Sequence, residues 1–129
     1  MRSDRRDEKR FISEVFEKMK SNPDLAGTFS EDGGRITWQL FEGYTVEIAS
    51  EYIGIHSQRP KGGYRFRHHW HPDDEDLYAD ICALGTRGNV TIILRTFGDT
   101  TGVVYSGPRD GCPEKKNGLF RKYIYLYAE

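Results

Sequence analysis

Three of the four histidines in this chain lie in one short run, residues 64–71. Successive side chains of an extended strand point to opposite faces, so the run sorts its residues into two chemistries. One face carries two guanidiniums and two imidazoles, from Arg65, Arg67, His69 and His71. The other face carries three aromatic rings and one further imidazole, from Tyr64, Phe66, Trp70 and His68. The first of these surfaces, the Arg/His face, suits an anion, an acidic partner or a metal ion.

Anion binding is the first interpretation of the Arg/His face. The planar fork of arginine binds carboxylate or phosphate, and histidine gains a charge below about pH 6.5. We therefore expect a small binding or regulatory module, not an enzyme, that contacts an acidic protein surface or a small anionic or phosphate-bearing ligand. Arg109, in a long loop, is expected to assist. The competing interpretation is a polar outer sheet face, in which the arginines pair with acids on neighbouring strands such as Glu47 and Glu51.

Metal binding is the second interpretation. His69 and His71 alternate on one strand face, and His56 or Asp73 would complete a ligand set. Such a site would make the chain a metal-dependent hydrolase. The acids at residues 73–76 have another explanation, because carboxylates in the first turn of a helix cap its N–H groups and complement its dipole. No other cofactor is expected.

A third interpretation is a small inhibitor or accessory protein, of the kind that phages and mobile elements encode. Such a protein would occupy a larger partner through a charged and aromatic surface. A row of tyrosines, Tyr123, Tyr125 and Tyr127, also predicts an edge strand through which two copies would form a homodimer.

Composition and motifs argue against other classes. The net charge is -1, so no overall basic field attracts nucleic acid. Cys82 and Cys112 lack zinc-ribbon spacing, and no nucleophile elbow, phosphate-binding loop or zinc-protease motif occurs. No apolar run reaches the length of a membrane span, and residues 1–10 are too charged for a signal peptide. We expect a cytoplasmic protein without membrane contact.

Two helices and a set of strands must position these side chains. Apolar residues recur at helical spacing across residues 4–20 and 73–84, which predicts two helices. Gly85 is predicted to cap the C-terminus of the second helix. The segment between the first helix and residue 35 is predicted to be a loop. Strand patterns follow at residues 36–40, 44–48, 53–55, 64–71, 90–97, 103–105 and 119–127. Residues 41–43 predict a hairpin whose glycine has positive φ, and the apolar residues on both faces of 90–97 predict a central strand.

The expected fold is α+β. We predict a mainly antiparallel, twisted sheet of about six to seven strands, with the N-terminal helix and one mid-chain helix packed against it. The length of 129 residues fits one globular domain, residues 1–129, of which the charged residues 1–10 are expected to fray.

Overall fold

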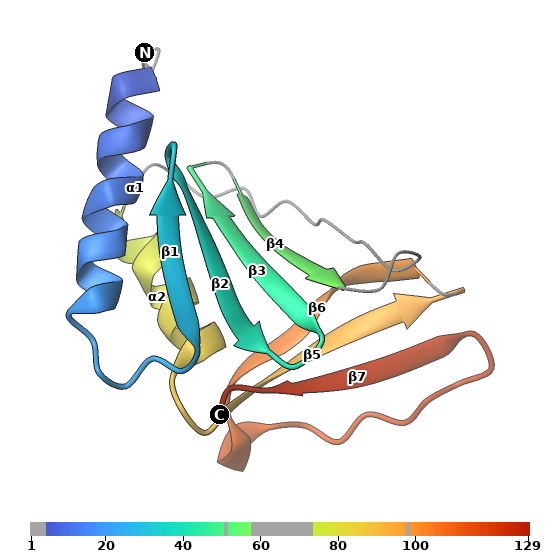
Figure 1. Ribbon diagram of the computed structural model, residues 1–129. Helices are drawn as coiled ribbons and strands as arrows, with labels where there is room; N and C mark the ends of the chain where they lie inside the picture. Colours follow the sequence, from blue (N-terminus) through green and yellow to red (C-terminus); the bar gives the residue numbers. More distant parts are fainter. Residues whose placement is uncertain (1–4, 51, 58–73, 98) are drawn as a thin grey trace.

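The computed structural model describes residues 5–50, 52–57, 74–97 and 99–129. The described elements are two α-helices, seven strands and one short 3₁₀-helix (Figure 1). The helices are α1 (Arg5–Lys20), α2 (Asp74–Gly85) and the 3₁₀-helix η1 (Arg109–Gly111). The strands are β1 (Thr28–Asp32), β2 (Arg35–Phe41), β3 (Tyr44–Ala49), β4 (Tyr52–Ser57), β5 (Asn89–Thr96), β6 (Asp99–Pro108) and β7 (Arg121–Tyr127).

The predicted α+β class, with antiparallel strands and two helices, is confirmed. The described strands divide into two sheets, one of four strands in the order β1-β2-β3-β4 and one of three in the order β6-β5-β7. Every pairing is antiparallel, and β5 is central in its sheet, as its two apolar faces predict. Gly43 closes the β2–β3 hairpin with a φ of +80°, which glycine adopts without steric cost. Residues 64–71, also predicted as a strand, lie outside the described residues.

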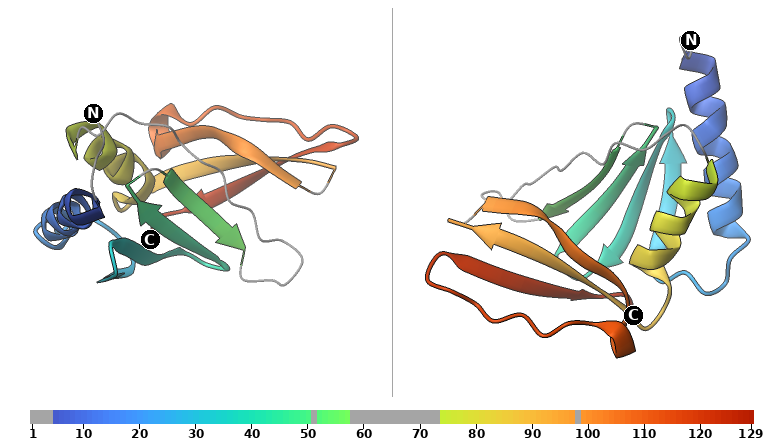
Figure 2. Two further views of the ribbon diagram at one scale, coloured as in Figure 1. Left: turned by 90° about the horizontal axis from the view of Figure 1, so that it is seen from above. Right: turned by 180° about the vertical axis from the view of Figure 1, so that it is seen from behind.

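One hydrophobic core joins both helices and both sheets. The helices contribute the residues that their spacing predicts, all fully buried or nearly so: Ile12, Val15, Met19, Leu77, Ile81 and Leu84. Ile93 of β5 and Leu126 of β7 belong to the same cluster. Helix α1 lies beside β1 and β2, and α2 packs against the near ends of β5 and β6, while the far end of the three-stranded sheet stands clear of both helices (Figures 1 and 2).

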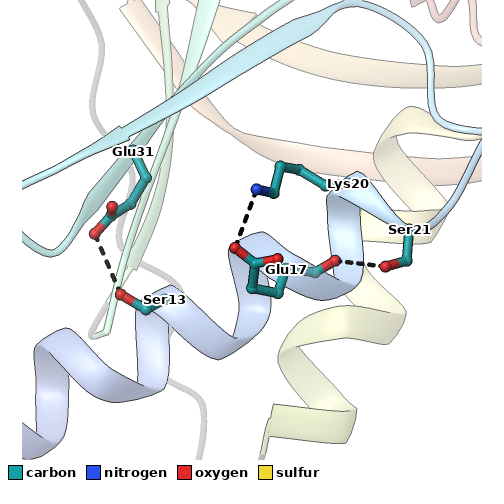
Figure 3. Close-up of polar contacts among 5 residues, drawn as sticks. All are labelled: Ser13, Glu17, Lys20, Ser21 and Glu31. Atoms are coloured by element: carbon teal, nitrogen blue, oxygen red, sulfur yellow. Dashed lines mark hydrogen bonds and ion pairs between the residues drawn. The ribbon is translucent and has the colours of Figure 1, made fainter.

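Strand β1 lies where a loop is predicted, and the loop prediction is wrong. Its inward positions hold Phe29 and Glu31, so only one apolar residue marks the buried side. Glu31 is accommodated there because the Ser13 hydroxyl of α1 donates a hydrogen bond to its carboxylate at 3.5 Å (Figure 3). At the end of α1 the Ser21 hydroxyl donates to the Glu17 carbonyl at 2.9 Å (Figure 3). The Phe16 ring of α1 packs edge-on against Phe29 with centres 5.8 Å apart, so one aromatic contact and the Ser13–Glu31 hydrogen bond hold α1 against β1.

Gly85 ends α2, as predicted, but without the left-handed conformation of a glycine cap. Its φ is not among the positive values found at other glycines of the described chain. A Cβ at this position would instead overlap the six-membered ring of Trp38, which is fully buried. The Trp38 indole N–H donates to the Ala26 carbonyl at 2.8 Å, and the Ala26 N–H donates to the Gly85 carbonyl at 2.7 Å. Gly85 thus allows the end of α2 to pack directly on the tryptophan.

Candidate functional site

Most of the predicted site lies beyond the described part of the chain. Arg65, Arg67, His69 and His71, which make up the Arg/His face, all belong to residues 58–73, as does Asp73 of the predicted metal site. Their extended conformation and their convergence stay predictions. His56 and Arg109 are the two predicted site residues that the structure describes.

His56 lies on β4, directly opposite Thr45 of β3, on the face of the four-stranded sheet turned away from the core. Its Nε2 atom is buried and has no hydrogen-bond partner among the described residues. Within the described ranges, no group of three His, Cys, Asp or Glu side chains is arranged to hold a metal ion. A metal site through His56 would therefore need ligands from outside those ranges.

Arg109 lies in η1 and contacts the last strand. Its guanidinium carbon is 4.5 Å from the centre of the Tyr127 ring, and Nη2 is 3.5 Å from a carboxylate oxygen of Glu129. A cation above an aromatic face is attracted to the ring, and the carboxylate offsets its charge. Arg109 therefore ties η1 to the end of the chain, at the opposite end of the three-stranded sheet from the β5–β6 turn.

The tyrosine row lies on one face of β7, as predicted, and β7 is an edge strand of the described sheet. The loop before β7 covers part of this surface. The Tyr125 hydroxyl accepts a hydrogen bond from the Lys115 N–H at 3.0 Å, and the Tyr123 N–H donates to the Asn117 side chain at 2.8 Å. Part of the edge predicted to pair with a second copy is thus already bonded within the chain.

A hollow of about 640 Å³ lies beside the β1–β2 hairpin and α1. Its charged lining residues carry both signs: Glu8, Lys9, Asp32, Arg35 and Glu47. Glu47 accepts a hydrogen bond from the Tyr52 hydroxyl and lies 3.7 Å from Arg35 Nε. Mixed and partly paired charges select neither an anion nor a cation, so this hollow is a weak candidate.

A polar cluster joins the ends of the two helices. The Asn22 side-chain amide donates to the Tyr78 hydroxyl at 3.0 Å and lies 3.8 Å from the Cys82 sulfur. Burial raises the pKa of Tyr78 above its usual value, so the hydroxyl stays neutral at physiological pH. The neutral hydroxyl also donates to the Lys18 carbonyl at 3.4 Å. These contacts explain the cluster as a link between α1 and α2.

The far end of the three-stranded sheet exposes three large apolar side chains, which we call the apolar tip: Phe97, Leu119 and Phe120. Their exposed fractions are 73%, 89% and 53%. The two phenylalanine rings stack with centres 4.7 Å apart, and the Phe97 N–H donates to the Phe120 carbonyl at 3.1 Å. Phe97 has a φ of +54°, a left-handed conformation that bulky residues rarely adopt.

Two basic side chains lie directly behind the apolar tip, and we call them the cation pair: Arg95 and Lys122. They are partners in the β5–β7 register, so both project from the same face of the sheet. Arg95 Nε is buried and has no hydrogen-bond partner within residues 5–50, 52–57, 74–97 and 99–129. Together with the three tip residues, the cation pair lines a recess of about 220 Å³.

Sequence reasoning missed this site because its parts come from two distant segments. From the sequence, Leu119 and Phe120 are predicted only as the start of a strand, and Arg95 as part of the strand pattern at residues 90–97. One clue was the phenylalanine at 97, immediately before Gly98-Asp99 in a turn that favours small or polar residues. Only the register of β5 with β7 brings the pieces together.

Among the described helices, none is long and apolar enough to span a membrane. No family model, curated protein or solved structure matches this chain. The apolar tip and the cation pair are the candidate functional site of the described chain.

Proposed function

We propose that this protein is a binding module that docks onto an acidic surface of a larger protein through the apolar tip. The observation that carries the proposal is Phe97, a phenylalanine that is 73% exposed in a left-handed backbone conformation. Both properties work against folding stability, because the ring gains little from burial and the backbone is strained. Strained residues persist mainly where they serve contact with a ligand or partner.

The tip has the composition of a contact centre in a protein interface. Exposed apolar side chains are ordinary when scattered singly, but three gathered at one end of a sheet are not. Aromatic residues and arginine are enriched among residues that dominate binding energy, especially where a partner excludes water around them. The stacked Phe97 and Phe120 rings, with Arg95 behind them, match this description.

Charge favours an acidic partner. Five basic residues of the three-stranded sheet and its long loop form no ion pair with a described carboxylate: Arg95, Lys115, Lys116, Arg121 and Lys122. Residues 89–129, which make up this sheet and its loop, hold six Arg or Lys against four Asp or Glu, so the local charge is positive although the whole chain has a net charge of -1. A local basic surface attracts an acidic one and raises the association rate in a salt-dependent way.

The Arg/His face remains a second predicted surface for the same kind of partner. Its residues lie outside the described ranges, so it adds to the proposal from the sequence alone. We also propose that the chain acts as a small inhibitor or accessory protein of this partner, that it folds as one domain and that it is cytoplasmic.

The test uses the full chain, immobilised and exposed to extract from its own source. A variant with Phe97, Leu119 and Phe120 all replaced by serine removes the tip. Val104→Ser is the matched control, since Val104 is 39% exposed on β6 but lies outside the tip. Captured proteins are identified and purified, and binding is then measured by calorimetry.

The expected result is one dominant acidic partner that binds the wild type and the Val104 variant alike. Loss of contact-centre residues typically costs at least about 2 kcal/mol, so the tip variant should bind roughly 30-fold more weakly or worse. Circular dichroism checks that all three chains fold. Equal binding by the tip variant and the control would overturn the proposal.

A further inference from the structure

We infer that the recess behind the apolar tip binds the carboxylate of one acidic side chain of the protein partner, held between Arg95 and Lys122. This inference rests on the proposed docking function and names what that surface recognises.

The register of the sheet provides the first argument. Arg95 and Lys122 are directly opposite each other on neighbouring antiparallel strands. Side chains at such positions are close, and like charges there are destabilising. Neither residue forms an ion pair with a described carboxylate that would offset the repulsion. An anion placed between the two would turn this repulsion into attraction.

Burial of Arg95 Nε provides the second argument. The atom is shielded from solvent and donates no hydrogen bond to any residue that the structure describes. A buried donor without an acceptor has lost its hydration and gained nothing in return. A carboxylate would supply an acceptor, because its two oxygens match the parallel N–H groups of a guanidinium.

The size and walls of the recess select the kind of anion. Its volume of about 220 Å³ is below the roughly 300–1,000 Å³ of sites that hold drug-sized ligands, so it suits a single side chain better than a nucleotide. Three of its five lining residues, Phe97, Leu119 and Phe120, are apolar. These walls fit the aliphatic stem of glutamate or aspartate, and a singly charged carboxylate loses less hydration among them than a phosphate dianion.

The probe is a short peptide, blocked at both ends, with one glutamate between two leucines. Counterparts carry glutamine or phosphoserine in place of the glutamate. Binding is followed by NMR on the full chain through the Nε–Hε resonance of Arg95, identified by its loss in Arg95→Gln. The glutamate peptide should shift this resonance saturably, and the glutamine peptide should leave it in place.

Variants at two adjacent positions separate a specific site from general charge attraction. Lys122 lies on the recess face, and Arg121 lies on the opposite face of β7. Lys122→Gln should raise the dissociation constant at least about tenfold, as expected for a lost charge-assisted contact, while Arg121→Gln, which removes the same charge from the opposite face, should weaken peptide binding far less. Lys122→Glu should abolish peptide binding and raise the unfolding midpoint by roughly 1–4 °C, because it places a carboxylate opposite Arg95.

Three results would overturn the carboxylate site: tighter binding of the phosphoserine peptide, an equal effect of Arg121→Gln, or a lowered unfolding midpoint in Lys122→Glu. The outcome is independent of the docking test. A partner that needs the apolar tip but is indifferent to Lys122→Gln would leave docking standing and remove the carboxylate site. If the peptide binds the recess but partner binding is unchanged when the tip is removed, the carboxylate site stands and the docking proposal falls.

Discussion

Phe97 should reverse the usual order of alanine and glycine. At ordinary strand and turn positions alanine is more stabilising by about 0.4–1 kcal/mol, because glycine leaves the unfolded chain more freedom. At a φ of +54° any Cβ is strained, at a cost of roughly 1–2 kcal/mol, and glycine escapes that cost. Phe97→Gly should therefore be more stable than Phe97→Ala by about 0.5–1 kcal/mol. Both variants lose the same ring stacking with Phe120, so that loss cancels in the comparison.

Urea unfolding followed by circular dichroism measures the difference. With a slope near 1.5 kcal/mol per molar urea, the two midpoints should differ by roughly 0.3–0.7 M. Thr101 is the matched control, because it is exposed on the same hairpin and has no positive φ. At this position Thr101→Ala should be more stable than Thr101→Gly, because no left-handed strain favours glycine. Both substitutions remove the same hydrogen bond from the Thr101 hydroxyl to the Leu94 carbonyl, so that loss cancels.

A Phe97→Ala variant at least as stable as Phe97→Gly would contradict this prediction. The backbone at position 97 would then not be strained, and strain would give no reason to assign Phe97 to partner contact. Partner binding should fall equally in both variants, because each lacks the ring. Phe97→Gly is thus expected to be more stable than Phe97→Ala while binding the partner no better.

Three further predictions concern other parts of the molecule. Gly85→Ala should cost about 1–3 kcal/mol of unfolding free energy by overlap with the buried tryptophan, whereas Gly102→Ala, which meets nothing within 4 Å, should cost far less; similar urea midpoints would contradict this. Because burial raises the pKa of Tyr78, its hydroxyl supports folding fully below about pH 10 and progressively less above it, so Tyr78→Phe should lose less thermal stability than the wild type as the pH rises above about 10, and parallel losses would exclude this. Replacing Arg65 and Arg67 by glutamine should weaken partner binding, and wild-type binding should be tighter at about pH 5.5 than at 8 if the histidines of that face gain charge; no change with pH would count against the Arg/His face.

The sequence predicts the elements that bury a periodic apolar face. The helix spacing of Ile12, Val15 and Met19 and the glycine at Gly43 lead directly to α1 and the β2–β3 hairpin. Strand β1 escapes prediction because Glu31 occupies an inward position that a hydroxyl from α1 satisfies, a contact between elements that no local pattern reveals. The division into two sheets is likewise a matter of pairing between distant segments, which alternation along one strand does not encode.

The candidate site was harder to predict than the fold for the same reason. Arginine and histidine residues occupy every second position from 65 to 71, and this local pattern is enough to predict one charged strand face. The cation pair joins residues 95 and 122, and its significance depends on register and on the burial of one nitrogen. Two basic side chains that are distant in sequence can be recognised as neighbours only once the strand pairing is known.

The backbone hydrogen bonds at the apolar tip affect the rate at which this protein would associate with its partner. The Gly118 N–H donates to the Arg121 carbonyl at 2.9 Å, and the Phe97 N–H donates to the Phe120 carbonyl at 3.1 Å, so backbone bonds support Leu119 and Phe120 from both sides. A contact that is already ordered loses little freedom on association. Encounter should then proceed as between two rigid bodies, with a rate set by diffusion and salt and without a slow folding step after the first collision.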